Sequence, residues 1–232
     1  MDQLIVALDV DSSAQALDLS DQLQGVAGGF KIGSRLFCAE GPPLVRRMVT
    51  RGHRIFLDLK YHDIPSTVSA AVHAAADLGV WMLTVHATGG YDMLAAAKEA
   101  AANQDEGPQI VAVTVLTSFD DTTLRGLGVS RSVPQQVEAL ARLAQSAGVD
   151  GVVASPLEIG LIREACGNDF IVVTPGIRNC TMDQMHDQKR TMDAASAIAA
   201  GSSYLVVGRP ITAASDPRGA AAQIGQQITT QA

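Results

Sequence analysis

Eight short apolar segments recur along the chain, and each is followed by a stretch with the spacing and punctuation of a helix. The segments are rich in Val, Ile and Leu on both faces, which is typical of parallel strands covered by helices. Between them, Pro42-Pro43 opens a predicted helix that Gly52 closes, and Pro65 opens another that Gly79 closes. The eight predicted strands are Leu4–Val10, Gly29–Gly33, Arg54–Lys60, Met82–Ala87, Gln109–Leu116, Gly151–Ser155, Asp169–Gly176 and Tyr204–Pro210.

Strict alternation of strand and helix, repeated eight times in 232 residues, predicts an α/β chain folded as a (β/α)₈ TIM barrel. A doubly wound open sheet is the main alternative, but it usually has fewer strands at this length. Neither G-x-G-x-x-G nor G-x-x-x-x-G-K-[ST] is present to support it. With no linker or low-complexity segment, we expect residues 1–232 to form a single barrel domain. The two longest irregular stretches, Thr117–Val133 and Ile177–Thr191, follow strands at the predicted catalytic rim.

The charge balance limits the possible partners. Lys and Arg number 17 against 24 Asp and Glu, so the net charge is −7, and aromatic residues make up only 4%. Such a chain repels nucleic acid and anionic membranes at long range and has few rings on which bases could stack. Three scattered cysteines indicate reduced thiols, and no apolar run reaches the roughly 18 residues of a membrane span. We therefore expect a cytoplasmic protein with neither nucleic acid nor membrane as a partner.

Charged residues gather at the ends of the first three predicted strands. Asp9 ends the first, Lys31 lies in the second, Asp58 and Lys60 end the third, and Asp63 follows in the next loop. Active sites of such barrels sit at the carboxyl ends of the strands. One charge there would be a solvated strand end, but five of alternating sign predict a network in which each partner stays ionised. A lysine between carboxylates is then a proton donor or an anion clamp.

Side-chain alternation in the third predicted strand indicates which residues face the helices and which face the barrel axis. Ile55, Leu57 and Leu59 form a wholly apolar set that must face the helices. Their neighbours Phe56, Asp58 and Lys60 are then expected to point toward the barrel axis, with the two charges at its mouth.

Gly/Arg pairs end the last two predicted strands, as Gly176-Ile177-Arg178 and Gly208-Arg209. Barrels commonly bind phosphate at these two loops, where glycine allows close approach of the backbone and arginine offers a bidentate fork. This favours a small phosphorylated substrate over the alternative that both glycines are only turn residues. The five histidines show no ligand spacing, so we predict no metal site.

The motifs at and near the ends of these predicted strands resemble those of the orotidine 5′-phosphate decarboxylase family, and the resemblance covers essentially the whole chain. D-L-K-Y-H-D-I-P-S-T at Asp58–Thr67 is similar to the family signature. Its first part, D-x-K-x-x-D, is shared by a superfamily of phosphosugar barrels, whereas the continuation D-I-P-x-T is specific. The other matching motifs are A-L-D at Ala7–Asp9, F-K-I-G at Phe30–Gly33, V-T-V-L-T-S at Val113–Ser118, T-P-G-I-R at Thr174–Arg178, D-Q at Asp187–Gln188 and G-R-P at Gly208–Pro210.

The resemblance implies decarboxylation of orotidine 5′-phosphate to UMP, the last step of de novo pyrimidine synthesis, with no cofactor or metal. It assigns Lys60 as the proton donor to C6, with Asp58, Asp63 and Lys31 completing a charged tetrad. It also implies a homodimer in which Asp63 and Thr67 reach the neighbouring site. The remaining expected contacts are Asp9 to the ribose, Thr117 to the pyrimidine, and Arg178, Gln188, Gly208 and Arg209 to the phosphate, with Gln184 as an alternative to Gln188 because the intervening loop is one residue longer than is usual in bacterial members.

Two other functions compete with this one. A magnesium-dependent enzyme of the same superfamily, acting on a ketose phosphate, would share D-x-K-x-x-D but carry a metal-binding glutamate near the position of Lys31. A protonated lysine cannot bind magnesium. The second alternative is a catalytically silent phosphosugar-binding barrel, but a pure binder gains nothing from burying Lys60 among charged neighbours.

Overall fold

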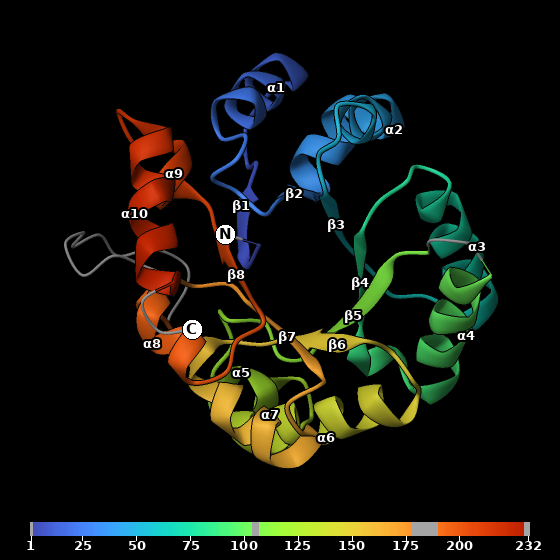
Figure 1. Cartoon of the computed structure of the whole chain (residues 1–232). Helices are drawn as coiled ribbons and strands as arrows, with labels where there is room; N and C mark the ends of the chain where they lie inside the picture. The colour runs from blue at the N-terminus through green and yellow to red at the C-terminus, as the bar shows by residue number, and fades with distance from the viewer. Residues whose placement is uncertain (1, 104–106, 178–189, 230–232) are drawn as a thin grey trace.

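A computed structural model describes residues 2–103, 107–177 and 190–229 of the chain. Eight parallel strands form a closed barrel in chain order, with β1 paired to β8, and helices surround it (Figure 1). The predicted (β/α)₈ barrel is confirmed. The strands are β1 (Leu4–Ala7), β2 (Gly29–Gly33), β3 (Ile55–Tyr61), β4 (Met82–His86), β5 (Gln109–Val113), β6 (Gly151–Val153), β7 (Ile171–Thr174) and β8 (Tyr204–Val207).

The core has two layers, because each strand is buried on both faces. A small cluster that includes Ile5, Phe56 and Met82 fills the inside of the barrel, and a larger one packs the strands against the helices. The helical elements are α1 (Ser13–Gln22), α2 (Ser34–Thr50), α3 (Pro65–Ala76), η1 (Ala87–Gly89), α4 (Tyr91–Ala102), α5 (Asp121–Gly126), α6 (Val133–Ser146), η2 (Pro156–Glu158), α7 (Ile159–Cys166), α8 (Ala194–Ala199), α9 (Arg209–Thr212) and α10 (Pro217–Thr229).

Two expectations differ from the observed helices: the start of one predicted helix and the content of one stretch that was expected to be irregular. The helix expected to open at Pro42-Pro43 begins earlier, at Ser34, and is kinked at Gly41, whose φ of 63° only glycine adopts readily. The prolines open only its second half. The stretch Thr117–Val133, expected to be irregular, contains α5, which Asp120 caps by accepting the Thr123 N–H. Most of the stretch Ile177–Thr191 lies outside the described residues.

Seven of the predicted strands extend beyond the observed ones. In most of them the excess is one to three residues at the carboxyl end. For example, β5 ends at Val113 rather than at Leu116. Apolar side chains continue beyond the last ladder hydrogen bond because the segments entering the rim stay buried, as Val115 does at 5% exposure.

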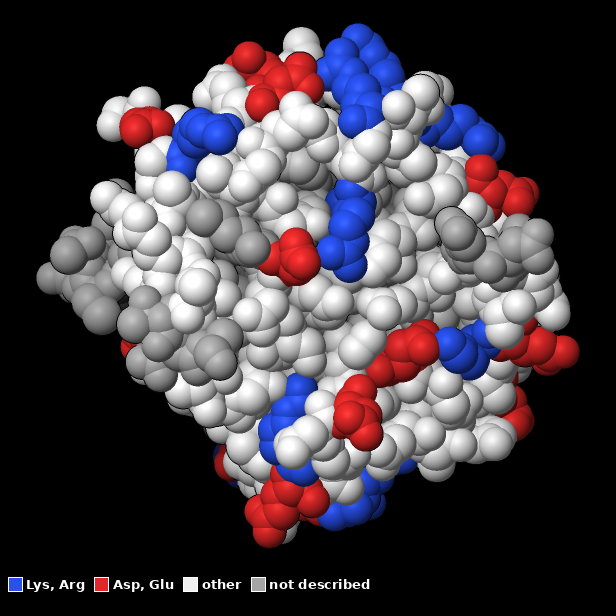
Figure 2. All heavy atoms as spheres, viewed as in Figure 1, with Lys and Arg blue, Asp and Glu red and all other residues white. Residues whose placement is uncertain are grey.

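The surface carries charges of both signs. On the face drawn in Figure 2, Lys and Arg side chains are interspersed with Asp and Glu, and the described residues there form no broad basic area of the kind that nucleic acids bind. In the described ranges, every helix is too short or too polar to cross a bilayer.

Candidate active site

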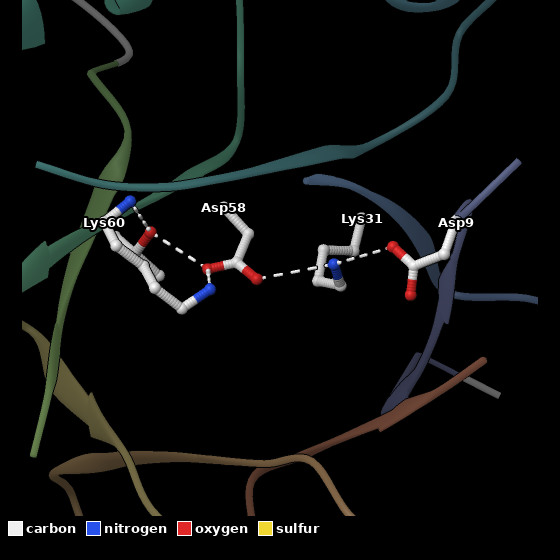
Figure 3. Close-up of polar contacts among 5 residues, drawn as sticks. Asp9, Lys31, Asp58 and Lys60 are labelled. Atoms are coloured by element: carbon white, nitrogen blue, oxygen red, sulfur yellow. Dashed lines mark hydrogen bonds and ion pairs between the residues drawn. The ribbon is translucent and has the colours of Figure 1, made fainter. Parts of the chain in front are cut away.

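Four charged side chains form a row across the carboxyl ends of β1, β2 and β3 (Figure 3). Lys60 Nζ lies 2.7 Å from Asp58 Oδ1, and Lys31 Nζ lies 3.4 Å from Asp58 Oδ2 and 3.4 Å from Asp9 Oδ1. Signs therefore alternate along the row, and its formal charge is zero. Burial falls toward its ends: the side chains of Lys31 and Asp58 are each 12% exposed, Lys60 is 35% exposed and Asp9 is 58% exposed.

Asp58 is the centre of this row. Burial by itself would raise the pKa of its carboxyl group. The ammonium groups of Lys31 and Lys60, with hydrogen bonds from Lys60 and Thr84, outweigh burial and lower the pKa below its ordinary value of 3.8. Asp58 is therefore a carboxylate at neutral pH, held between two cations.

The backbone of β3 is irregular where it carries these charges. Leu57 pairs with Leu83 and Tyr61 pairs with Val85, so three residues of β3 lie opposite one residue of β4. Lys60 has a φ of 54°, and no other described residue except glycine has a positive φ. This left-handed conformation costs an L-residue roughly 1–2 kcal/mol. A β-bulge of this kind re-aims side chains, and here it aims the side chain of Lys60.

Gly33 has no side chain, and this leaves room for the ammonium group of Lys31. A Cβ at Gly33 would lie 3.0 Å from Lys31 Nζ and 3.6 Å from Asp9 Oδ1, so a larger residue there would press on the ammonium group. Gly208, after β8, lies against the other side of Asp9, since a Cβ there would be 3.7 Å from Asp9 Oδ2. The end of β8 is thus adjacent to the charged row.

His86 ends β4 beside the same row. Its ring centroid lies 5.6 Å from that of His62. Burial, followed by the nearby His62 and Lys60, lowers the pKa of His86 below 6.5, while Asp58 opposes this shift. His86 is accordingly neutral at pH 7 and adds no further cation next to Lys60.

The other expected site residues are more dispersed. Asp63 and Thr67 are exposed, between β3 and the first turn of α3, and among the described ion pairs Asp63 has none with Lys60. Thr117 is half-buried in the turn after β5, and Arg209 is exposed at the start of α9. Arg178, Gln188 and the alternative Gln184 lie outside the described residues.

Two residues at the rim were missed from the sequence. Arg190 ties together the segments after β5, β6 and β7: its guanidinium lies 2.5 Å from Glu158 Oε1 and donates to the Leu116 carbonyl at 3.1 Å. Thr84, fully buried in β4, contacts both Asp58 and Lys60. A hydroxyl inside the otherwise apolar start of β4 was the signal for Thr84, whereas Arg190 had none.

No described group of three or more His, Cys, Asp or Glu side chains is placed to hold a metal ion. The arrangement instead presents an ammonium group that can donate a proton or stabilise a developing negative charge. It is held by a buried carboxylate, which a second lysine contacts through its other oxygen.

Known proteins resemble this chain over most of its length. A relative from Moorella thermoacetica, named orotidine 5′-phosphate decarboxylase, is 53% identical over 98% of this chain and 92% of its own. Another of that name, from Syntrophotalea carbinolica, is 51% identical over 97% and 94%. The crystal structure of orotidine 5′-phosphate decarboxylase from Lactobacillus acidophilus is 38% identical and matches with a TM-score of 0.85 over 97% of this chain and 98% of that one. The family model described as "Orotidine 5′-phosphate decarboxylase / HUMPS family" matches residues 2–224, and the chain belongs to this family.

Proposed function

We propose that this protein converts orotidine 5′-phosphate to UMP and carbon dioxide without a cofactor, as the last step of de novo pyrimidine synthesis. The observation that carries the proposal is the row of Asp9, Lys31, Asp58 and Lys60, in which a buried carboxylate holds an ammonium group at 2.7 Å. The names of relatives that are about half identical over nearly the whole chain support the same reaction. Cys38 and Cys166 are free thiols, which fits a cytoplasmic location.

Lys60 is the proposed proton donor. Decarboxylation breaks the bond between C6 of the pyrimidine and its carboxylate carbon, and the bonding electron pair stays on C6 as carbon dioxide leaves. The carbanion has no obvious delocalisation, so an ammonium group already in place stabilises the charge as it develops. Lys60 transfers a proton to C6, and the neutral amine takes a proton back from water. Asp58 holds the ammonium group in position, and Lys31 contacts the other oxygen of Asp58.

The remaining proposed contacts are those that the resemblance to the family implies. Asp9, at the exposed end, is proposed to contact the ribose, and Thr117, after β5, the pyrimidine. Gly208 and Arg209 follow β8 beside Asp9 and are proposed to bind the phosphate, together with Arg178 and Gln188. The phosphate is remote from C6, so its binding energy can order the charged site around the substrate.

The direct test is loss of the orotate absorbance when chelator-treated protein is mixed with orotidine 5′-phosphate. Rapid turnover without added metal is expected. If the protein is silent with this substrate and active on a ketose phosphate once magnesium is added, the proposed reaction is wrong and the magnesium-dependent alternative is right.

We also propose a homodimer in which Asp63 and Thr67 of one subunit complete the site of the other. Residues 62–67 are all exposed, and Ile64 exposes 63% of its surface, so this segment is accessible to a second subunit. An open hollow of about 530 Å³ adjoins them and can receive a partner's side chains. It is lined by His62, Asp63, Ile64, Pro65, Thr88 and Gly89.

Mixing two inactive variants tests the shared site. In a hybrid of Lys60→Ala and Asp63→Ala subunits, one site has both residues intact and the other has neither. Random exchange makes half of the dimers hybrid, so we expect up to about a quarter of wild-type activity, measured as kcat per subunit. If activity does not return although exchange between tagged subunits is complete, both residues act within one subunit.

A further inference from the structure

Thr84 occupies the one position of β4 that lies opposite the bulge in β3. Phe56 pairs with Met82 inside the barrel, so two residues further along each strand bring Asp58 and Thr84 side by side on the inner face. Beyond them the pairing shifts, and Thr84 is the sole β4 residue between Leu83 and Val85. Its surface is 0% exposed.

The Thr84 hydroxyl joins the two ends of that bulge. Its oxygen accepts the Lys60 backbone N–H at 2.8 Å, and its proton is donated to Asp58 Oδ1 at 3.1 Å. The same Oδ1 accepts a hydrogen bond from the Lys60 ammonium group at 2.7 Å. These contacts close a ring that runs from the Lys60 backbone through Thr84 and Asp58 to the Lys60 side chain. One hydroxyl thereby fixes both where Lys60 leaves the strand and where its charged end is held.

We propose that Thr84 is a positioning residue for the decarboxylation, an inference that rests on the proposed function of Lys60. The left-handed backbone at Lys60 is unfavourable and persists only where neighbouring groups hold it. Without the hydroxyl, the half-buried Lys60 N–H loses its acceptor and Asp58 loses a donor, so the ammonium group is no longer held at one place. Errors of about 1 Å in the position of a reacting group cost up to about 100-fold in rate.

The test compares Thr84→Val, which keeps the shape and removes the hydroxyl, with Thr84→Ser, which keeps the hydroxyl. We expect kcat of Thr84→Val to fall about 10- to 100-fold with KM changed by less than about threefold, because the phosphate contacts are untouched. Thr84→Ser should restore most of kcat.

Thr114→Val is the matched control. Thr114 is also buried, at 4% exposure, and its hydroxyl donates to the Val153 carbonyl at 2.9 Å. That carbonyl keeps the Thr114 N–H as a donor when the hydroxyl is removed. This variant loses the same group just after β5, the strand next to β4, without touching Lys60 or Asp58, so its kcat should stay near the wild-type value.

Hydrogen exchange at the Lys60 amide gives a readout that does not depend on activity. Exchange should be at least about 10-fold faster in Thr84→Val than in the wild type, and slow again in Thr84→Ser. An active enzyme in which Thr84→Val keeps its kcat would overturn the positioning role. A wild-type protein that does not decarboxylate orotidine 5′-phosphate would overturn the proposed function instead, while the exchange rates still decide whether Thr84 holds the Lys60 backbone.

If Thr84→Val does not fold, as judged by circular dichroism and thermal melting, Thr84→Ala takes its place. The kcat of Thr84→Ala should then lie well below that of Thr84→Ser, and equal values would overturn the proposal.

Discussion

Lys60→Ala should lower kcat on the order of 10⁴-fold, the upper end of what a positioned proton donor contributes, while the barrel stays folded. The substitution removes both the proposed proton donor to C6 and the positive charge that is proposed to stabilise the carbanion. Lys31 still neutralises Asp58 from 3.4 Å, so the buried carboxylate is not left alone. Steady-state kcat with orotidine 5′-phosphate, measured on protein with a wild-type circular dichroism spectrum, checks this result.

Lys98 provides the matched control for Lys60. It pairs with Asp150 at 2.6 Å and is 33% exposed, nearly the geometry of the Lys60 pair, but it lies at the amino ends of β5 and β6. Lys98→Ala should therefore leave kcat close to that of the wild type. If both alanine variants lost activity equally, the effect would come from general weakening of the barrel, and Lys60 would lose its role as proton donor.

Asp58→Asn should lower kcat by roughly 10³-fold, because two lysines would then face each other without the anion between them and the site would lose its fixed charge arrangement. The amide has the same size as the carboxylate, so packing is preserved. Asp150→Asn removes the anion of the control pair and should have little effect on kcat. A kcat of Asp58→Asn within about tenfold of the wild type would show that the charge of Asp58 is dispensable.

Asp58→Asn should also change how the free energy of unfolding depends on pH. The pKa of Asp58 is lowered below 3.8 in the folded chain, so on acidification the unfolded chain binds this proton first. The contribution of Asp58 to stability is therefore complete above pH 3.8 and is lost as the pH falls through the folded-state pKa. The difference in unfolding free energy between wild type and Asp58→Asn, from urea titrations, should be constant near neutrality and shrink in acid. A difference that grows in acid would contradict the lowered pKa.

Much of the fold and of the charged row follows from the sequence because both depend on local pattern. Runs of Val, Ile and Leu between helix signals were enough for eight parallel strands. The alternation in β3 placed Asp58 on the same side as Phe56, since a period of two survives as far as Asp58, whereas the bulge beyond it aims the side chain of Lys60. What each of these residues does in the reaction remains a prediction.

The bulge in β3 could not be predicted in this way. The segment Ile55–Tyr61 has the composition of a regular strand, and the positive φ of Lys60 arises from contacts with β4 rather than from any local preference. The hydroxyl of Thr84 stands out in an apolar strand, but its role could not be predicted, because that role depends on the residues opposite it in β3. The helix preceding Pro42 was missed because the prolines are a strong start signal that hides the weaker turn before Gly41.

The order of the strands in the chain has a consequence for how the protein is made. All four residues of the charged row lie within the first 60 residues, whereas Gly208, which lies against Asp9, follows β8. A ribosome therefore releases the charged row early and β8, the strand that closes the barrel, much later. Until Leu205 pairs with Leu4, β1 remains an unpaired edge. A nascent chain can thus carry the whole charged row while β1 still lacks the strand that closes the barrel beside it.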